Sequence, residues 1–518
     1  MGSERRGANA FAVKLFANCR AYAFEPAGRT YAVHDAVLVD GTRFAGFDES
    51  LAGGGVERID LGGAFVLPAF ADCHVHLTDT GYMLGGRDLG GVRSAAEFEA
   101  RIAALPVERF VLAGNYDESR WLDGASATAQ PLDSHLPEAL AMCVRVDGHS
   151  CLVNRKTLAH LNLEAHLPGL ECDADGIPTG RLFLDANWRA QSRFFAQLPL
   201  AERRAAERCA GELALREGAV HLHVQLVGFG GRDAYAAEID ALRSLPGLQI
   251  YPKICERDPA LASSLGLPFV GGDVFLDGSI GSGTAALSAP YCWGAFTDGA
   301  ASCGRLAHSD AELEAYFSAA ERLGISAGVH AIGDRAIEQC VMTWDRVLGG
   351  KASPRNRHFI EHFEMATPAH IARCAQLGIY LSMQPQFDAD WGGEGGMYEA
   401  RLGTQRMRSM NALGSALRAG AILCGGDDSP VCRLSPLTGM AAACAHHTES
   451  ERLTPLEALT MYTYDAARLG HAESHAGLLA PGYDADFVVL DRDAPGDGSF
   501  AAARVLQTWV DGTCVYSS

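Results

Sequence analysis

The stretch that decides the fold is Leu67-Pro-Ala-Phe-Ala-Asp-Cys-His74-Val-His76-Leu, an apolar run that ends in two histidines two positions apart. Side chains two apart on a β-strand point to the same side, so both imidazoles can face one divalent metal ion. A His-x-His pair alone is a weak signal, and the alternative interpretation is a strand with two ordinary histidines. The stretch nevertheless makes hydrolysis by a metal-activated water the first function to test.

Outward from this stretch, apolar strand-like segments alternate with helix-like segments, which is typical of parallel βα units. The expected strands are residues 66–76, 218–226, 249–256, 273–279, 324–332, 357–364, 379–386 and 421–428. Eight is the number that closes a barrel, so the sequence predicts an α/β fold with a (β/α)8 TIM barrel. Helices are expected over residues 310–323, after a Ser309 cap, and over residues 367–378, with Pro368 in the first turn and Gly378 at the end.

The two ends of the chain have a different sequence pattern from the middle. Short segments of alternating polar and apolar residues, typical of β-strands and separated by Gly and Asp, fill the first 65 residues, and the same pattern returns at the C-terminal end. We therefore expect a composite β-sandwich built from residues 1–65 and 473–518, beside a barrel of residues 66–472. The span 85–217 is too long for one βα connection, and we expect it to be an insertion that shapes the substrate pocket.

The composition suits a large soluble globular protein, because 48% of the 518 residues are hydrophobic and the mean hydropathy is near zero. The net charge of −20 argues against nucleic acid as a partner, since phosphate binding needs clustered Lys and Arg. No apolar run of about 18 residues occurs, so we expect no membrane span. The 15 cysteines are scattered, and we interpret them as buried thiols of a reducing compartment, with the cytoplasm as the default location. The oligomeric state is left open, with a homodimer as one option.

Polar residues at the ends of later strands could join the two histidines. His330 ends the fifth expected strand, Glu361 and His362 stand in the sixth, and Asp428 ends the eighth. Each alone has an ordinary explanation: a buried core histidine for His330 or His362, and the start of a turn before Pro430 for Asp428. Active sites of such barrels lie at the carboxyl ends of the strands, so together, in this order, these residues form a candidate ligand set.

In this order, and followed by the β-rich stretch Ala480-Pro-Gly-Tyr-Asp-Ala-Asp-Phe-Val-Val-Leu-Asp, the residues resemble the amidohydrolase superfamily. Four further stretches resemble its branch of N-substituted formamide deformylases: Arg145-Val-Asp-Gly-His-Ser, Gly176-Ile-Pro-Thr-Gly, Asp277-Gly-Ser-Ile-Gly-Ser and His330-Ala-Ile-Gly-Asp-Arg-Ala. The resemblance covers nearly the whole chain, and its motifs lie far apart yet in order. It implies a metal-dependent enzyme that acts on C–N bonds other than peptide bonds.

The resemblance also implies a ligand set, which consists of His74, His76, His330 and Asp428. His362 would bind a second metal or orient the water. Asp428 is preferred over Asp427 because the branch reads Gly-Ser-Asp-x-Pro-Val, and Asp428 stands two residues before Pro430. We expect one or two divalent ions, with zinc as the first choice and iron or manganese as alternatives, since all three accept His and Asp ligands.

The sequence departs from this branch at one position that matters. The branch usually carries on the fourth strand a lysine that bridges two metals once it is carboxylated, and Asp273 stands at the matching place. Lys253 on the third strand could take over this duty, because other branches draw the bridge from different strands. The alternative is an ordinary lysine at the rim of the barrel. If neither residue bridges, one metal is expected.

The expected mechanism follows from charge. A bound divalent cation lowers the pKa of water by several units to about 7, which makes hydroxide available at neutral pH. Asp428 would accept the proton of the water and hand it to the leaving nitrogen. The metal or His149 would polarise the carbonyl group. His223, which forms a second His-x-His pair with His221, and Asp277 are further candidates for contact with the substrate.

The predicted function is therefore hydrolysis of a C–N bond in a small neutral amide, formamide or cyclic amide. Two alternatives stay open. One is a deaminase that acts on a ring amidine with the same water and the same aspartate. The other is a catalytically silent metal-binding protein.

Overall fold

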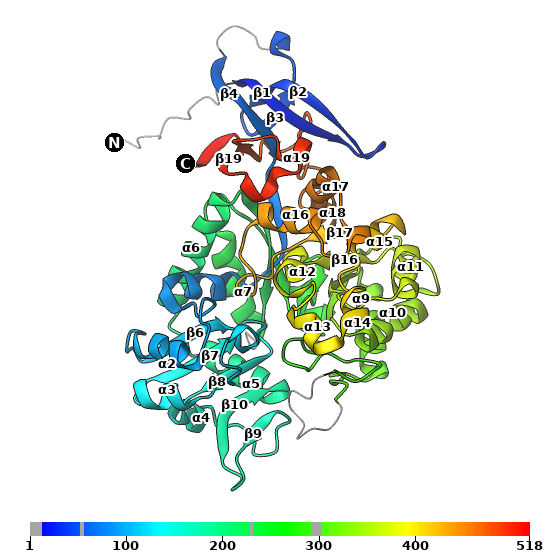
Figure 1. Ribbon diagram of the computed structural model, residues 1–518. Helices are drawn as coiled ribbons and strands as arrows, with labels where there is room; N and C mark the ends of the chain where they lie inside the picture. The colour runs from blue at the N-terminus through cyan, green and yellow to red at the C-terminus, as the bar shows by residue number, and fades with distance from the viewer. Residues whose placement is uncertain (1–12, 52–55, 228–230, 293–301) are drawn as a thin grey trace, which may run out of the picture.

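The computed structural model describes residues 13–51, 56–227, 231–292 and 302–518, and Figure 1 shows the arrangement of its elements. The structure is α/β with several sheets. At the top of Figure 1, strands from both ends of the chain form one seven-stranded sheet in the order β20-β19-β18-β4-β1-β2-β3. These strands are β1 (Lys14–Glu25), β2 (Thr30–Asp40), β3 (Arg43–Gly46), β4 (Glu57–Pro68), β18 (Phe487–Leu490), β19 (Val505–Val510) and β20 (Thr513–Ser517). Residues 1–12 and 52–55 of the expected N-terminal unit lie outside the described residues.

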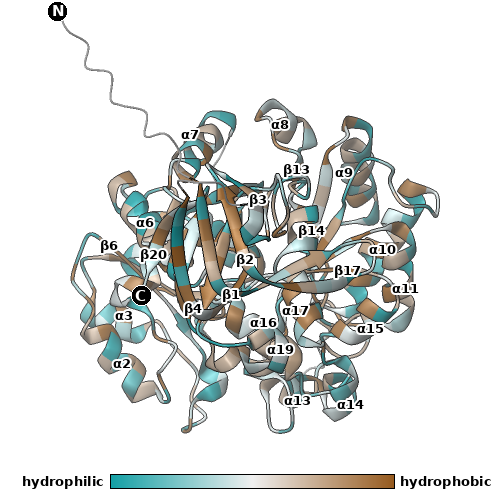
Figure 2. Ribbon diagram, turned by 90° about the horizontal axis from the view of Figure 1, so that it is seen from above, coloured by the Kyte–Doolittle hydropathy of each residue, from teal (hydrophilic) through white to brown (hydrophobic). Residues whose placement is uncertain are grey.

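The terminal sheet has a core of its own, made by rings from the two ends of the chain. The ring centroid of Phe16 lies 4.9 Å from that of Phe487 and 4.8 Å from that of Trp509. Figure 2 looks down on this sheet and shows β4, β1 and β2 side by side, with helices around them. Strand β4 continues toward the next sheet, so the terminal sheet is joined directly to the part of the chain that carries His74 and His76.

Eight shorter strands form two parallel sheets below the terminal sheet. The first has the order β12-β11-β5 and the second the order β13-β14-β15-β16-β17. The strands are β5 (Phe70–Val75), β11 (Ala219–Leu226), β12 (Gln249–Ile254), β13 (Phe269–Val270), β14 (Ser326–Ala331), β15 (Phe359–His362), β16 (Tyr380–Met383) and β17 (Ile422–Gly425). Seven of them fall inside the ranges expected from the sequence.

Backbone hydrogen bonds link the two parallel sheets at both of their edges. The amide of Gly271 donates to the carbonyl of Ile254 at 2.8 Å, which places the chain after β13 beside β12. The amide of Asp428 donates to the carbonyl of His74 at 2.8 Å, which places the chain after β17 beside β5. The ends of β5 and β17, far apart in the sequence, are therefore neighbours.

The expected strand over residues 273–279 is wrong in position. The fourth parallel strand is the two-residue β13, and within the expected range only Phe275 forms an isolated bridge, to His330. Gly271 and Gly272 explain the difference, because both have positive φ angles, 86° and 100°, which a strand cannot continue through. The chain turns there and runs on as a loop.

Helices follow the parallel strands and cover them. The longest are α6 (Leu200–Arg216), α7 (Arg232–Arg243), α9 (Asp310–Leu323), α10 (Asp334–Leu348) and α11 (Pro368–Leu377). Shorter ones are α1 (Leu77–Tyr82), α8 (Pro259–Ser264), α12 (Pro385–Trp391), α13 (Met397–Leu402), α14 (Thr404–Met407), α15 (Leu413–Arg418), α16 (Pro436–Cys444), α17 (Pro455–Met461), α18 (Tyr464–Leu469) and α19 (Ala494–Asp497). The two helices expected from capping signals are confirmed, since Ser309 caps α9 and Thr367 caps α11.

The segment expected to be an insertion folds around a separate sheet with both parallel and antiparallel strand pairs, seen at the lower left of Figure 1. Its five strands have the order β6-β7-β8-β10-β9. They are β6 (Phe110–Tyr116), β7 (Leu140–Arg145), β8 (Ser150–Val153), β9 (Leu170–Cys172) and β10 (Pro178–Phe183), and the accompanying helices are α2 (Ala95–Ala103), α3 (Gln130–His135), α4 (Arg155–Leu161) and α5 (Leu184–Phe195). Buried apolar clusters lie on this sheet, so the segment has its own packing rather than being a loose loop.

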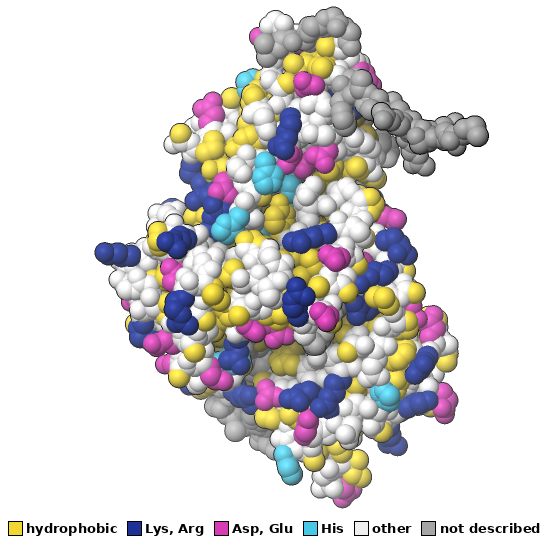
Figure 3. Space-filling view, turned by 180° about the vertical axis from the view of Figure 1, so that it is seen from behind, with side chains coloured by type: hydrophobic (Ala, Val, Ile, Leu, Met, Phe, Trp, Pro, Cys, Tyr) yellow, Lys and Arg dark blue, Asp and Glu magenta, His cyan; other side chains and the backbone are white. Residues whose placement is uncertain are grey.

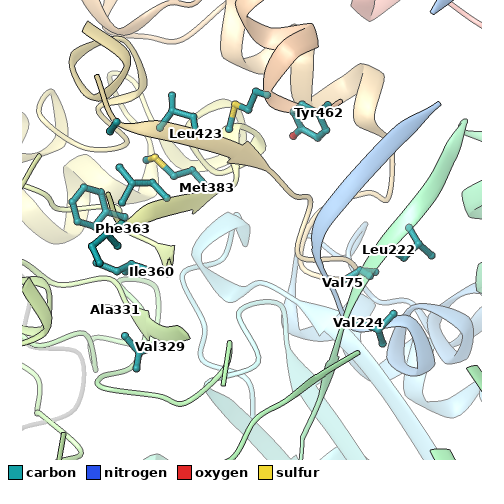
Figure 4. Packing of buried hydrophobic residues seen from close by; sticks show 14 of the residues in the cluster. Val75, Leu222, Val224, Val329, Ala331, Ile360, Phe363, Met383, Leu423 and Tyr462 are labelled. Carbon is teal, nitrogen blue, oxygen red and sulfur yellow. The ribbon is translucent and has the colours of Figure 1, made fainter. Parts of the chain in front are cut away.

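The main hydrophobic core lies between the parallel strands and their helices. Figure 4 shows Val75 of β5 beside Leu222 and Val224 of β11, and Ile360 and Leu423 on the neighbouring sheet.

On the face seen in Figure 3, acidic and basic side chains are intermixed, with apolar side chains between them. Every helix in the described ranges is too short or too polar to cross a bilayer. All 15 cysteines are free, and the expectation of buried thiols holds only in part, because four of them, including Cys172 and Cys209, are exposed.

Candidate metal centre

His74 and His76 stand at the end of β5 and face the same side of it. Val75 between them points into the hydrophobic core, so strand alternation turns both imidazoles away from that core. His74 is fully buried, whereas the side chain of His76 keeps 20% of its surface exposed. The ring centroids of the two histidines lie 5.4 Å apart.

Asp428 meets both rings from the chain after β17. Its Oδ1 atom lies 3.2 Å from Nε2 of His74 and 3.2 Å from Nε2 of His76. The backbone of Asp428 is left-handed, with φ 52°, a conformation that costs free energy in a residue other than glycine and that often marks functional sites. The neighbouring Asp427 is used differently, because its Oδ2 atom accepts a hydrogen bond from the amide of Ser435 at 2.6 Å. The structure thus places Asp428, rather than Asp427, against the histidines.

Asp273 is a second carboxylate at the same place, and the sequence reasoning did not assign it a role. Its Oδ2 atom lies 3.4 Å from Nε2 of His74 and 3.1 Å from Nε2 of His76. The signal was present in the sequence: Asp273 stands where the related branch carries its bridging lysine. A carboxylate at that position offers the oxygen atoms that a carboxylated lysine would otherwise supply.

His362 completes the cluster from the end of β15. Its Nε2 atom lies 3.8 Å from Oδ1 of Asp273, and its Nδ1 atom contacts Oε1 of Gln384 at 2.9 Å. Adjacent residues of a strand point to opposite sides, yet Glu361 and His362 both face the interior. Two consecutive left-handed residues, His362 with φ 70° and Phe363 with φ 54°, turn the chain so that this becomes possible.

These side chains form two groups that could hold a cation, each with its ligand atoms within 4.8 Å of one another. One group consists of His74, His76 and Asp428, and the other of His74, Asp273 and His362. His330, which the sequence reasoning placed in the ligand set, belongs to neither group of described residues. Its ring packs on that of His362 with centroids 4.4 Å apart, and its Nδ1 atom lies 3.5 Å from Oδ1 of Asp277.

The electrostatics of the cluster favour a positive charge at its centre. Burial alone would lower the pKa of His76, but hydrogen bonds and charges from Asp273 and Asp428 outweigh it and raise that pKa to about 10. Burial alone would raise the pKa of Asp428, but the charge of His74 and hydrogen bonds from the two imidazoles hold it well below its usual range. The two carboxylates thus draw positive charge toward the facing nitrogens of His74 and His76.

A metal ion fits this donor set. Three fully buried atoms of the two groups, Nε2 of His74, Oδ1 of Asp273 and Oδ1 of Asp428, have no partner in good hydrogen-bond geometry among the described residues. Buried polar atoms normally find a partner, and a bound cation would supply one for all three. Imidazole nitrogen and carboxylate oxygen are ligands that zinc, iron and manganese accept.

A buried layer of polar residues lies behind His74. Lys253, expected either at the rim or as a carboxylated bridge, donates from Nζ to Oε1 of Glu361 at 2.7 Å and to the carbonyl of Cys73 at 2.8 Å. Glu361 was visible beside His362 in the sequence, but its direction depends on the left-handed turn and could not be read there. Gln225, which contacts both His74 and Glu361, was not singled out either.

A cavity of about 760 Å³ opens in front of the two groups. His149 and Asp277, both expected to contact the substrate, line it together with Trp188 and Phe275, whose rings stack at 4.0 Å. Asp277 accepts hydrogen bonds from three backbone amides, including that of Gly333 at 2.8 Å, so its main contacts hold loops in place. Helix α5 of the expected insertion supplies Trp188, which agrees with a role of that segment in shaping the pocket.

His223, which the sequence predicted to contact the substrate, lies apart from this cavity. His223 does not line this cavity in the described structure; its ring stacks on Tyr251 with centroids 4.8 Å apart and lies near Phe269. Burial lowers the pKa of His223 well below its usual value. The reason is position along the strand. His221, His223 and Gln225 point to the same side of β11, but Gln225, nearest the carboxyl end, contacts His74, whereas His223 lies among the rings of Tyr251 and Phe269. The pair is a packing element next to the terminal sheet.

The chain is similar to known proteins over nearly its whole length. The family model described as "Amidohydrolase family" matches residues 57–516. The protein YtcJ of Bacillus subtilis (strain 168) is 26% identical over 533 residues, which cover 95% of this chain and 97% of YtcJ. The N-substituted formamide deformylase of Arthrobacter pascens is 26% identical over 537 residues, which cover 93% of this chain and 94% of that enzyme. A crystal structure of an uncharacterized metal-dependent hydrolase from Pyrococcus furiosus superimposes with a TM-score of 0.71 at 25% identity, covering 93% of this chain and 100% of that one. From the length of the family match and the arrangement of the site, we conclude that the chain belongs to the amidohydrolase family.

Proposed function

We propose that the chain is a metal-dependent hydrolase that cleaves a C–N bond of a small molecule, in an amide, a formamide or a cyclic amide. The observation that carries this proposal is the convergence of Asp428 and Asp273 on the facing nitrogens of His74 and His76. The likeness to an N-substituted formamide deformylase over nearly the whole chain supports the choice of bond.

Zinc is the proposed ion, at one site or two. The ligand group of His74, His76 and Asp428 would hold the first ion, and Asp273 with His362 would hold a second or complete the first. His330, packed on His362, is the remaining proposed ligand. A divalent cation in such a site acts as a Lewis acid, which makes water more acidic and polarises a carbonyl oxygen.

The residues of the chain would then move one proton and orient one carbonyl group. Asp428 would take a proton from the attacking water while the oxygen of that water bonds to the carbonyl carbon of the substrate. The C–N bond breaks, and Asp428 returns the proton to the leaving nitrogen. His149, which lines the cavity with its ring 5.0 Å from that of His330, is placed to donate a hydrogen bond to the carbonyl oxygen.

We also propose a domain architecture for the chain. The eight parallel strands, joined at both edges, would close as the TIM barrel of residues 66–472, and the terminal sheet would form a composite β-sandwich of residues 1–65 and 473–518. The span 85–217 would be the insertion of that barrel. A cytoplasmic location and a homodimer complete the proposal.

The test begins with elemental analysis of the purified protein. The protein is then screened against formamides, linear amides, cyclic amides and ring amidines, with formate, amine and ammonia measured separately. We expect about one or two equivalents of metal, and release of amine or ring opening that a chelator abolishes and zinc restores. Ammonia from a ring amidine alone would replace the proposal by a deaminase, and tight metal without any hydrolysis would overturn it.

A further inference from the structure

A buried ion pair lies directly behind the ligand groups. Lys253 and Glu361 are both fully buried, and their Nζ and Oε1 atoms lie 2.7 Å apart. Lys253 also donates to the carbonyl of Cys73, the residue before His74, and its Nζ atom lies 4.5 Å from the centroid of the Phe359 ring. Burying two charges is costly even when they are paired, so such a pair rarely adds stability by itself. A role in positioning another group would explain its presence.

The group that it touches is the ring of His74. The second oxygen of Glu361, Oε2, lies 2.9 Å from Nδ1 of His74. Two acceptor atoms at this distance would repel each other, so the contact favours the tautomer with its hydrogen on Nδ1, facing the carboxylate. The ring then keeps its lone pair on Nε2, the atom that faces Asp273 and Asp428.

Gln225 is the other polar neighbour of Nδ1. Its amide nitrogen lies 3.3 Å from Oε1 of Glu361 and 3.1 Å from Nδ1 of His74, and its amide oxygen accepts a hydrogen bond from the backbone amide of Asp273 at 3.3 Å. The amide N–H of Gln225 could serve Nδ1 only if that atom were without a hydrogen, so the two neighbours favour opposite tautomers. The shorter contact, to the charged carboxylate of Glu361 at 2.9 Å, favours the hydrogen on Nδ1.

We propose that Glu361, neutralised by Lys253, is a positioning residue that holds His74 with its Nδ1–H on the carboxylate and its Nε2 toward the metal. This inference rests on the proposed metal-dependent function. Ligand histidines in metal sites commonly give their second ring N–H to a carboxylate, which sets the tautomer and strengthens the ligand.

The same geometry gives Lys253 a role other than that of a carboxylated bridge. Its Nζ atom donates to two acceptors, the carboxylate of Glu361 and the carbonyl of Cys73. A carbamate on Nζ would put a negative group against both of them and leave Glu361 without its counter-ion. Lys253 therefore stays an unmodified amine. Protein equilibrated with ¹³C-bicarbonate is expected to show no carbamate carbon by ¹³C NMR, and such a signal that disappears in Lys253→Met would overturn this assignment.

The central experiment compares Glu361→Gln with Glu321→Gln. Glu321 is a matched control, because its Oε2 atom also contacts a histidine at 2.9 Å, Nε2 of His358, but away from the ligand groups. Zinc affinity is measured by competition with a chelator, and the cobalt-substituted proteins are compared by visible absorption. We expect about 10- to 100-fold weaker zinc binding and an altered cobalt spectrum in Glu361→Gln, with both unchanged in Glu321→Gln.

A double variant keeps the test decisive if Glu361→Gln folds poorly. Lys253→Met with Glu361→Gln removes both charges together and leaves neither buried without a partner. It is expected to fold and to bind zinc as weakly as Glu361→Gln. Wild-type zinc affinity and cobalt spectrum in a folded Glu361 variant would overturn the inference, even if that variant unfolds at a lower temperature. The outcome is separate from the proposed function, which fails only if the unaltered protein binds no metal or hydrolyses nothing.

Discussion

The Nε2 atom of His76 and the Oδ1 atom of Asp428 lie 3.2 Å apart, although one follows the first parallel strand and the other the last. The backbone hydrogen bond from Asp428 to His74 fixes this approach, since it ties the ends of β5 and β17 together. A carboxylate held this close to two histidines of the proposed metal site can both face a metal and exchange a proton with a water beside it.

Asp428→Asn tests this double role. The amide keeps the shape of the side chain but cannot take the proton of the water, so we expect a loss of about 10² to 10⁴ in kcat. Metal content should stay close to that of the unaltered protein, because the histidines and Asp273 remain. Asp427→Asn is the neighbouring control, and equal losses in both variants would contradict the assignment of Asp428 as the proton carrier.

Asp273→Asn tests the carboxylate that stands in place of a bridging lysine. Both of its oxygen atoms lie near histidines of the proposed metal site: Oδ2 is 3.1 Å from His76 and Oδ1 is 3.8 Å from His362. Removing the negative charge should weaken metal binding, and the loss of activity should follow from the loss of metal. We expect metal to be lost on dialysis, with activity partly recovered at high zinc concentration. Full metal retention with normal activity would show that Asp273 is not a ligand.

Much of the first ligand group could be predicted from the sequence. Strand alternation alone turns His74 and His76 to one side, and the resemblance to a branch that reads Gly-Ser-Asp-x-Pro-Val favours Asp428 over Asp427. The helices α9 and α11 followed from their capping residues, because capping is a local interaction.

The residues that were missed depend on contacts across the fold. The role of Asp273 follows from the turn at Gly271 and Gly272, whose direction the sequence does not reveal. The inward direction of Glu361 depends on left-handed backbone at His362, which non-glycine residues rarely adopt. The burial of Lys253 depends on its partner Glu361 on another strand, so a lysine in a strand pattern could not be placed from its neighbours alone.

Removal of the metal should lower the stability of the protein. A ligand that binds only the native state adds about 2.7 kcal/mol when its concentration is 100 times its Kd. We expect a lower thermal midpoint after chelation and recovery on addition of zinc. Calcium should not restore it, because that ion prefers sites made of oxygen atoms alone. A midpoint that chelation leaves unchanged would argue against a native-state metal site.

Acid stability depends in part on a contact far from the ligand groups, between Glu321 and His358. The hydrogen bond from His358, at 2.9 Å, is the largest cause that lowers the pKa of Glu321, and although partial burial acts against it, the pKa falls to about 2. A glutamate in the unfolded chain has a pKa of about 4.3. Between these two values the unfolded state binds a proton that the folded state does not, so stability is lost as the pH falls.

Glu321→Gln should therefore remove this part of the acid sensitivity. Burial lowers the pKa of His358, although Glu321 acts to raise it, so a further loss of stability below about pH 6.5 is expected in both proteins and should be larger in Glu321→Gln. The range below about pH 4.3 is therefore the one in which the carboxylate of Glu321 itself titrates. In denaturant unfolding, the unaltered protein should be the more stable one at pH 7, and its advantage should shrink as the pH falls from about 4.3 toward about 2. A difference that stays constant over this range would mean that Glu321 has the same pKa in the folded and unfolded states.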